Sequence, residues 1–256
     1  GTLETVENQD IVFDKVSFSY DKRKPVLKDL SFTIPQGSKT AIVGPSGSGK
    51  TTIINLISRF YDVDSGTIKL GNRDLRDYKV ESLLKNLSLV FQDVYLFRDT
   101  IENNIRFANP NASREEVVEA AKKARCHNFI MELSEGYNTM VGEGGSSLSG
   151  GEKQRISIAR ALLKNASIIF LYEATSSVDP ENEYEILAAI EELSKGHTVI
   201  SIAHRLTTVR KADQILVIDD GKLVQEGKHS ELINREGIYS AFIQARERAA
   251  NWIINA

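Results

Sequence analysis

Residues 44–51 read Gly-Pro-Ser-Gly-Ser-Gly-Lys-Thr, and no other segment constrains the fold of this chain as much. The spacing of Gly44, Gly49, Lys50 and Thr51 is that of a phosphate-binding loop. Such a loop needs a strand before it and a helix after it. The residues before it are apolar and predict a buried strand, and those after it repeat apolar positions with helical spacing. These flanks argue against a glycine- and serine-rich turn that merely precedes a helix, and they predict an α/β core.

The residue types of this loop suit an anionic ligand. Its glycines let the backbone curl so that successive N–H groups point inward, and the helix behind adds the positive end of its dipole. We expect Lys50 to reach the β- and γ-phosphates of a nucleotide and the Thr51 hydroxyl to ligate Mg²⁺. The predicted nucleotide-binding segment consists of Gly44, Pro45, Ser46, Gly47, Ser48, Gly49, Lys50, Thr51 and Thr52.

Length and composition fit an ordinary globular protein. The 256 residues suit one large α/β domain or two small ones, and 41% hydrophobic residues are enough to build a core. A net charge of −3 gives no overall basic field, so we expect no nucleic-acid partner. Cys126 is the only cysteine, which excludes an intrachain disulfide and a cysteine-rich zinc site. No apolar run approaches the roughly 20 residues that cross a bilayer, so we expect the chain by itself to be soluble.

Hydrophobic patterns divide the chain into strand-rich and helical parts. Val16, Phe18 and Tyr20 alternate with polar residues and predict a half-buried strand, which residues 27–34 and 67–70 extend into an antiparallel β subdomain. About residues 98–160 we expect an inserted helical subdomain, with a capping box at residues 113–116.

The second half of the chain alternates apolar strands with helices, which predicts a mainly parallel sheet. The expected strands are 168–171, 199–203 and 215–218, and the expected helices are 152–163, 181–193 and 239–254. The fold class is therefore α/β, with a mainly parallel sheet, an antiparallel β subdomain and an inserted helical subdomain.

A second glycine-bearing motif, Leu148-Ser149-Gly150-Gly151-Glu152, opens one of these helices. It resembles the signature motif of ATP-binding cassette (ABC) ATPases, and a serine hydroxyl with glycine N–H groups at a helix start again suits an anion. Ser149 and Glu152 are also the two ends of a capping box, so a purely structural cap is the alternative. Taken alone, the motif leaves both interpretations open. Its pairing with the phosphate loop favours the first.

The resemblance to ABC nucleotide-binding domains covers residues 11–246, with the motifs in the family's order. It implies a P-loop nucleotide-hydrolase core, ATP as the substrate and Mg²⁺ as the cofactor. Tyr20 matches the aromatic residue that stacks on adenine, and Gln92 matches the glutamine that senses the metal and the γ-phosphate. Glu173 matches the glutamate that polarises the attacking water, and His204 matches the histidine that contacts the γ-phosphate.

The same resemblance implies a complete set of site residues. The expected catalytic residues are Lys50, Gln92, Glu173 and His204, the expected metal ligands are Thr51 and Gln92, and the expected signature contacts to ATP are Ser149, Gly150, Gly151 and Glu152. The implied boundaries are a leader or linker at 1–10, the ABC ATPase domain at 11–246 with its helical subdomain at 98–160, and a C-terminal tail at 247–256.

One position departs from the family pattern. The strand before Glu173 is followed in the family by aspartate and then glutamate, and here Tyr172 stands where that aspartate belongs. A neutral phenol does not replace a carboxylate near Mg²⁺, because hard cations prefer anionic oxygen. Lost outer-shell support costs about 10–100-fold in metal affinity or activity, so we predict impaired Mg²⁺ use and slow or absent turnover. An altered residue, a degenerate half of a heterodimeric transporter, and local repacking that rescues the metal are the three explanations.

Two further segments are similar to exporter-type ABC domains, namely residues 100–105 and 139–145. In exporters this region receives helices of the membrane domain. The resemblance therefore implies a transporter at the cytoplasmic face of the inner membrane, with an exporter's transmembrane domain and a second nucleotide-binding domain as partners. The phosphate loop of one copy would face Ser149 and Gly151 of the other, so that ATP joins the two. Generic loop and helix-start residues are the alternative explanation of these segments.

Two rival functions follow from the same residues. The first is a non-catalytic nucleotide-binding half of a heterodimeric transporter, for which Tyr172 is the evidence. The second is an ABC ATPase that works on DNA or ribosomes. Such proteins carry long coiled-coil insertions or tandem cassettes, whereas this chain reads as one compact, mildly acidic cassette. The transported substrate is not encoded in this domain, because specificity lies in the membrane domain.

Overall fold

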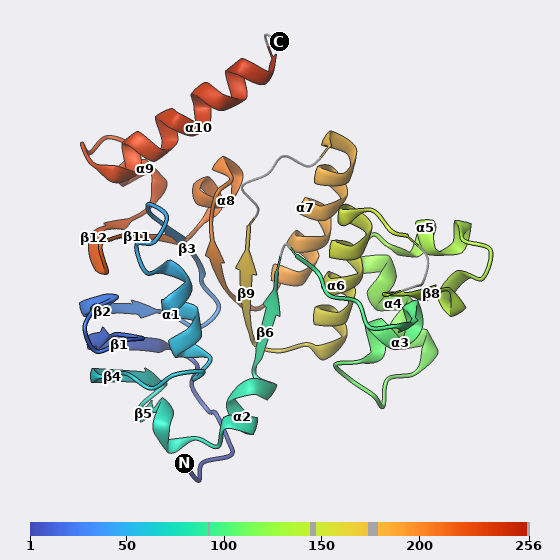
Figure 1. The fold of residues 1–256 in the computed structure, drawn as a ribbon, viewed down its shortest axis with the longest axis horizontal. Coiled ribbons are helices and arrows are strands. Elements are labelled where there is room, and N and C mark those ends of the chain that lie inside the picture. The colour runs from blue at the N-terminus through green and yellow to red at the C-terminus, as the bar shows by residue number, and fades with distance from the viewer. Residues whose placement is uncertain (92, 144–146, 174–178, 255–256) are drawn as a thin grey trace. The chain divides into compact units, whose positions relative to one another are not determined.

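The computed structural model describes residues 1–91, 93–143, 147–173 and 179–254. The chain folds into two compact units, which Figure 1 shows as ribbons. The first unit combines Gly1–Leu87 with Thr198–Ala256, and the second is Ser88–His197. Within the described residues, no helix combines the length and the apolar character needed to cross a membrane.

The first unit contains an antiparallel sheet in the order β2 (Leu27–Ile34), β1 (Ile11–Phe18), β4 (Ser65–Leu70) and β5 (Arg73–Asp74). Alternation along β1 buries one face, on which Phe13 stacks against Phe32 with ring centroids 4.4 Å apart. The expected antiparallel subdomain is confirmed. The strand that was predicted to include Tyr20 corresponds to β1. It ends at Phe18, so Tyr20 lies beyond it. Alternation continues into Tyr20 although the backbone turns away from the sheet there.

The remaining strands of the first unit are ordered β12 (Lys222–Gly227), β11 (Gln214–Asp219), β3 (Lys39–Val43) and β10 (Thr198–Ile202). β3 pairs in parallel with both β10 and β11, and only β12 joins antiparallel. Every residue of β10 is buried, which explains why its sequence does not alternate between apolar and charged residues. The mainly parallel sheet predicted from apolar strands alternating with helices is confirmed.

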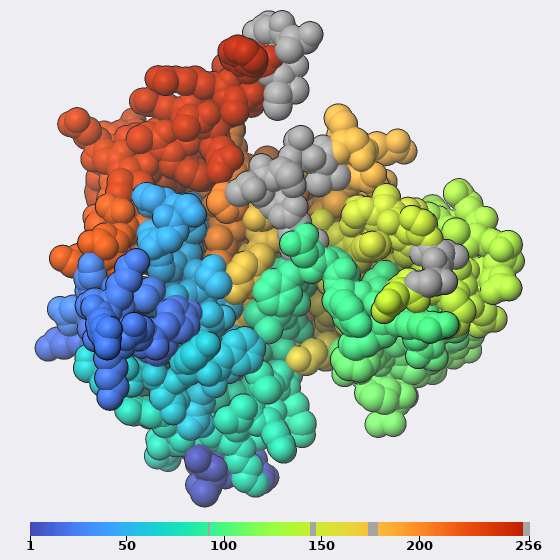
Figure 2. Space-filling view, viewed as in Figure 1, coloured from blue at the N-terminus to red at the C-terminus, as the bar shows by residue number. Residues whose placement is uncertain are grey.

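The helices of the first unit are α1 (Lys50–Ile57), α2 (Val80–Lys85), α8 (Leu206–Lys211), α9 (His229–Leu232) and α10 (Ile238–Ile254), with a 3-10 turn at Leu75–Asp77. The predicted C-terminal helix is α10, the red segment at the surface in Figure 2. Its first turns bury Tyr239 and Ile243 in a core that also contains Ala203 and Val209. The start of α10 is therefore held by the same core as the end of β10.

The second unit is mainly helical, with α3 (Ile101–Arg106), α4 (Arg114–Lys123), α5 (His127–Glu132), a 3-10 turn at Gly136–Asn138, α6 (Gly150–Lys164) and α7 (Pro180–Ser194). Its strands are β6 (Leu87–Val90) beside β9 (Ile168–Tyr172), and the short pair β7 (Asp99–Thr100) and β8 (Met140–Val141). α6 packs against α3, α4 and α7. Its apolar positions Ile156, Ile158 and Ala159 are buried, as their helical spacing predicts.

Local sequence signals fix where these helices begin. The Ser113 hydroxyl accepts the Glu116 N–H, and the Glu116 carboxylate accepts the Ser113 N–H, so the predicted capping box of α4 is confirmed. Asp179 caps α7 by accepting the Asn182 N–H at 3.0 Å, and Pro180 occupies the first turn. α4 starts at the residue that the sequence indicated, and α7 starts one residue before the expected 181, because a cap is a contact within four residues.

Candidate functional site

The predicted phosphate loop follows β3 and leads into α1 in the first unit. Backbone crowding requires glycine at its start, because a Cβ on Gly44 would lie 2.0 Å from the carbonyl oxygen of Ile218. Gly49 has a φ of +109°, and a Cβ there would come within 2.7 Å of the Leu27 side chain. The strand–loop–helix context that the motif demands is present, and these two glycines are needed by the fold as well as by any ligand.

Lys50 is buried at the first position of α1. Its Nζ donates to the carbonyl oxygens of Gly44, at 2.5 Å, and of Pro45, at 2.9 Å. Burial lowers the pKa of this ammonium, because the charged form is poorly solvated there. Neutral carbonyls are its partners here, and a phosphate placed in the same loop would favour the charged form.

A second buried polar group lies next to Lys50. The Ser48 hydroxyl oxygen has no hydrogen-bond partner in the described part of the chain and is shielded from solvent. An unpaired buried hydroxyl costs about 1–3 kcal/mol, so a loop that contains one gains from a ligand oxygen. Thr51, the expected metal ligand, is exposed beside it. The loop therefore fits an anion with several oxygens, such as a triphosphate.

Tyr20 is fixed by its hydroxyl to the helix behind the loop. The Tyr20 hydroxyl lies 3.0 Å from the Thr52 hydroxyl and accepts the Asn55 side-chain amide at 3.0 Å. Its ring meets Phe18 and Tyr61 edge-on, at centroid distances of 4.9 and 5.0 Å. Half of the residue is still exposed, so a ring held in a fixed plane is available to a flat partner.

His204 lies two residues beyond the end of β10, at the same sheet edge as the phosphate loop. β10 and β3 are parallel neighbours, Ile202 pairs with Ile42, and the Ala203 N–H donates to the Ile42 carbonyl at 3.0 Å. Both chains therefore leave the sheet at adjacent carboxyl ends, where ligands bind in open α/β sheets. Arg246, from α10, donates from its NH2 group to Nδ1 of His204 at 3.0 Å.

The signature segment begins α6 in the second unit. The Ser149 hydroxyl accepts the Glu152 N–H at 3.2 Å, and the Glu152 carboxylate accepts the Ser149 N–H at 2.9 Å. The capping box that was the structural alternative for this motif is therefore present. It does not exclude ligand binding, because the hydroxyl accepts in the cap and its own proton remains to be donated.

The two signature glycines differ in their surroundings. Gly150 is exposed, and a Cβ there would meet nothing within 4 Å. A Cβ on Gly151 would lie 2.9 Å from Asn182 of α7. The Asn182 side chain is itself fixed, because it accepts from Arg155 at 3.2 Å and donates to Asp179 at 2.7 Å. Gly151 is thus needed where α6 and α7 meet, whereas Gly150 faces open space.

At the end of β9, Tyr172 turns its ring onto Phe91, which follows the neighbouring strand β6. The ring centroids are 4.7 Å apart and the planes are at 27°. Glu173, the next residue, is half-buried. Gln92, the expected glutamine, lies outside the described residues, as do residues 144–146 of the exporter-like segment and residues 174–178.

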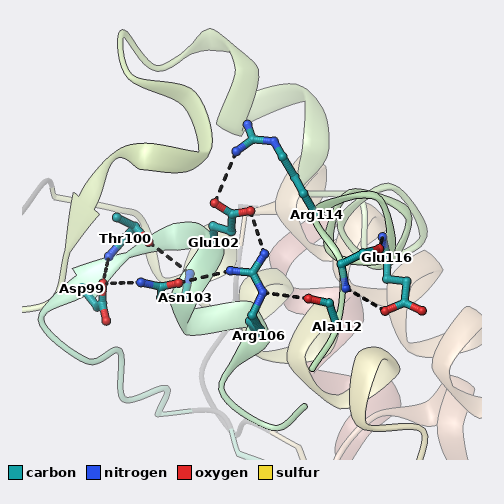
Figure 3. Close-up of polar contacts among 9 residues, drawn as sticks. Asp99, Thr100, Glu102, Asn103, Arg106, Ala112, Arg114 and Glu116 are labelled. Atoms are coloured by element: carbon teal, nitrogen blue, oxygen red, sulfur yellow. Dashed lines mark hydrogen bonds and ion pairs between the residues drawn. The ribbon is translucent and has the colours of Figure 1, made fainter. Parts of the chain in front are cut away.

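The start of α3 is braced by charged side chains, as Figure 3 shows. Glu102 accepts from Arg106 at 2.8 Å and from Arg114 of α4 at 3.3 Å. Asp99 accepts the Thr100 N–H at 2.7 Å, and hydrogen bonds from Asn103 and Thr100 lower the pKa of this carboxyl. These contacts hold the segment that follows Gln92 in the sequence.

Beside α3 the second unit has an open groove of about 460 Å³. Its lining includes Phe91, Val94, Tyr95, Phe97, Phe107 and Arg160. Tyr95 and Phe107 are mostly exposed, at 73% and 60%. The Arg160 guanidinium lies over both Phe97 and Phe107, and burial lowers its pKa. The groove is therefore aromatic, and its wall contains the desolvated cations of Arg160 and Lys164.

Three residues that support the site were not predicted from the sequence. Asn55 holds Tyr20, Asn182 packs on Gly151, and Arg246 holds His204. Asn55 lies one turn beyond the phosphate loop, so a search for polar residues on the inner turns of α1 could have found it. For the other two no sequence signal exists, because their contacts join separate elements. In the described part of the chain, no group of three or more histidine, cysteine or acidic residues could hold a metal.

Comparison with known proteins identifies a family for this chain. Residues 27–176 match the sequence family described as ABC transporter. The chain is 53% identical over 227 residues to an ATP-dependent lipid A-core flippase of Vibrio vulnificus (strain CMCP6). This match covers 88% of this chain and 39% of the relative. It is 49% identical over 243 residues to the uncharacterized ABC transporter ATP-binding protein YknV of Bacillus subtilis (strain 168). This match covers 95% of this chain and 40% of the relative.

A solved structure of a bacterial Atm1-family ABC exporter with ATP bound is also similar. Its TM-score to this chain is 0.87 at 45% sequence identity, and the match covers 94% of this chain and 42% of that one. The chain thus spans about two-fifths of the length of the relatives it matches. The similarity extends over almost all of this chain and leaves more than half of each relative unmatched.

Proposed function

This chain belongs to the ABC transporter family, and we propose that it is the ATP-binding and ATP-hydrolysing domain of an exporter. The observation that carries this proposal is the phosphate loop of the first unit. Lys50 is buried there against neutral carbonyls, and the neighbouring Ser48 hydroxyl is unpaired within the described residues. Both groups gain a charged or hydrogen-bonding partner when a triphosphate enters the loop.

Each site residue then has a definite task. The ring of Tyr20 stacks on adenine, and Lys50 binds the β- and γ-phosphates. His204 donates a hydrogen bond to the γ-phosphate, and Glu173 orients and polarises the attacking water. Mg²⁺, when bound, supplies positive charge next to the phosphate oxygens, and Thr51 and Gln92 are the residues that would hold it.

ATP joins two copies of the domain in this proposal. The phosphate loop of one copy and the signature residues of the other bind the same nucleotide, with the Ser149 hydroxyl donating to it. The start of α6 around Gly150, where an added Cβ would meet no atom within 4 Å, supports access for a second copy. Hydrolysis removes the γ-phosphate contact that both copies share, so the pair separates.

The exporter's transmembrane domain is the other partner. The aromatic groove of the second unit supports this assignment, because it opens beside the segment after Gln92 that is similar to the exporter pattern. An apolar helix with an acidic residue suits its exposed Phe107 and its desolvated Arg160. The domain would work at the cytoplasmic face of the inner membrane, and it would drive substrate transport.

Tyr172 favours a second version of this function. An aromatic ring packed on Phe91 offers no carboxylate to orient the metal, so turnover at the site built on this chain is slow. The chain would then be the non-catalytic half of a heterodimeric transporter, which binds ATP while a partner domain performs most of the hydrolysis.

The proposal is tested by nucleotide-dependent association of the domain. With Mg²⁺ and a nonhydrolysable ATP analogue, the chain should shift from one copy to two in light scattering. Lys50→Ala and Ser149→Ala should each abolish the shift, and Lys69→Ala, an exposed lysine of β4, should not. An equimolar mixture of Lys50→Ala and Ser149→Ala chains regains one intact site and should associate again. If the mixture remains monomeric, the shared site is wrong. If Lys50→Ala still binds the analogue, the assignment of the phosphate loop as the nucleotide site is wrong.

A further inference from the structure

The C-terminal helix contacts His204, two residues beyond the end of β10. Arg246, in the third turn of α10, donates from its NH2 group to Nδ1 of His204 at 3.0 Å. An arginine side chain carries five N–H donors and has no acceptor. The ring nitrogen in this contact therefore has to be the acceptor, so Nδ1 of His204 carries no proton while the contact lasts.

This contact determines the protonation pattern of the ring. A neutral imidazole has one N–H and one lone pair, so an unprotonated Nδ1 leaves the proton on Nε2. Nε2–H is a hydrogen-bond donor, as an anionic oxygen requires. The opposite tautomer would present a lone pair from Nε2, which repels such an oxygen.

Arg246 is well supported in this position. Its guanidinium lies over the ring of Phe242, one turn earlier in α10, at 5.3 Å from the centroid. The next residue, Glu247, forms an ion pair at 3.1 Å with Arg210 of α8, and α8 begins two residues after His204. At the start of α10, Tyr239 is buried in the core that contains Ala203. The helix is thus fixed to both sides of the β10–α8 corner.

We propose that Arg246 is a positioning residue, which holds His204 in the tautomer with the proton on Nε2, ready to donate to the terminal phosphate of a nucleoside triphosphate. The role at the phosphate rests on the proposed function of His204, whereas the tautomer rests on the Arg246 contact alone. The C-terminal helix therefore belongs to the nucleotide site, although its residues 247–254 were expected to be part of a tail.

The tautomer is read directly by nitrogen NMR of the histidine rings in the nucleotide-free chain at neutral pH. The chain has four histidines, and His204→Gln identifies the His204 signals by their loss. We expect the His204 Nδ1 resonance of the native chain at the position of an unprotonated nitrogen. In Arg246→Met this Nδ1 resonance should shift toward the averaged position of a histidine ring that exchanges between its two neutral tautomers and its protonated form. Arg248→Met, an exposed arginine of the same helix, is the matched control and should leave it unchanged.

The consequence for the ligand is measured as the preference for ATP over ADP, from the two dissociation constants. His204→Gln should lose about tenfold of this preference, as expected when one hydrogen bond to a charged group is lost. Arg246→Met should lose preference in the same direction, by about threefold or more, and Arg248→Met should keep the native value.

The positioning of the ring and its role at the phosphate can fail separately. If the Nδ1 resonance in Arg246→Met equals that of the native chain, the positioning role of Arg246 is wrong. If the resonance moves while neither Arg246→Met nor His204→Gln changes the preference for ATP, the positioning of the ring holds and the assignment of His204 to the terminal phosphate is wrong. Movement of both quantities in Arg246→Met supports the complete proposal.

Discussion

Tyr172 stacks on Phe91, with ring centroids 4.7 Å apart and planes inclined by 27°. Tyr172 ends β9, and Phe91 directly follows the neighbouring strand β6 of the second unit. The phenol stands where the resemblance to ABC domains implies an aspartate, and it is packed against a neutral ring. Stacked aromatic pairs contribute about 0.5–1.5 kcal/mol beyond the area they bury, so this residue has acquired a structural role at the position where a metal-orienting carboxylate is expected.

Replacing Tyr172 with aspartate should restore turnover. We expect Tyr172→Asp to raise the Mg²⁺-dependent rate of ATP hydrolysis by about 10–100-fold, because it returns an anionic oxygen to the neighbourhood of the metal. Phosphate release measured across a Mg²⁺ titration checks this. Tyr172→Phe, which keeps a ring for the stack and adds no charge, is the control and should remain slow. Equal rates in the native chain and Tyr172→Asp would refute the impairment.

The two signature glycines should respond differently to alanine. Gly151→Ala places a Cβ 2.9 Å from Asn182, whose side chain is held by Arg155 and Asp179, so it should cost about 1–3 kcal/mol of unfolding free energy. Gly150→Ala meets open space at the start of a helix and should stabilise by up to about 1 kcal/mol. Urea denaturation of both variants provides the measurement.

Asn182→Ser supplies the check on this explanation. The shorter side chain makes room for the new Cβ, so the double variant Gly151→Ala with Asn182→Ser should be more stable than the sum of the single changes predicts. Strict additivity would mean that the clash with Asn182 is not the cause.

Cys126 should resist alkylation in the folded chain. Burial raises the pKa of this thiol to about 12, from 9.0 for an ordinary cysteine. At pH 8.5 only roughly one molecule in 3,000 then carries the reactive thiolate, against about a quarter in the unfolded chain. Labelling with iodoacetamide should therefore be at least about 100-fold slower without urea than with it. Comparable rates in the two conditions would show that the folded thiol is accessible and that its pKa is not raised.

The same shift has a consequence for stability at alkaline pH. The unfolded thiol loses its proton near pH 9, whereas the folded thiol keeps it until about pH 12. Ionisation therefore favours the unfolded chain, and the contribution of Cys126 is fully present below pH 9 and is lost as the pH rises toward 12. Cys126→Ser should show a weaker decline of unfolding free energy over this range.

The charge network at the start of α3 should depend on its central carboxylate. Glu102→Gln removes the charge shared by Arg106 and Arg114, and we expect a loss of about 1–2 kcal/mol because Glu102 is largely buried. Arg114→Gln removes the more exposed of the two arginine partners and should lower the free energy of unfolding by less than about 0.5 kcal/mol. Thermal unfolding of the two variants tests the order, and a larger effect of Arg114→Gln would reverse the assignment.

Features that depend on neighbours in the sequence were predictable. The phosphate loop, with Gly44 and Lys50, was readable because its chemistry is contained in eight consecutive residues. The capping boxes that begin at Ser113 and Ser149 were readable because each joins residues only three apart. Apolar runs predicted the parallel strands, because a strand buried on both faces is apolar throughout. Alternation predicted the antiparallel strands, because a strand buried on one face has apolar residues at every second position.

The end of β1 shows where local patterns fail. Alternation continues from Phe18 to Tyr20, yet the strand stops at Phe18. The Tyr20 hydroxyl is bonded to Thr52 and Asn55, more than thirty positions away. No local pattern records such a bond, because it exists only once β1 and α1 have packed together.

The sequence by itself thus predicted the kind of chemistry: an anion-binding loop, a capped glycine motif and a strand that ends in Tyr172, where the resemblance to ABC domains implies aspartate. Only the tertiary structure decided how these residues are supported. It turned Tyr172 onto Phe91, packed Asn182 on Gly151 and brought Arg246 to His204, 42 positions away. The physical reason is that a side chain's partners across the fold are selected by packing of whole elements, whereas its intrinsic chemistry is fixed by residue type.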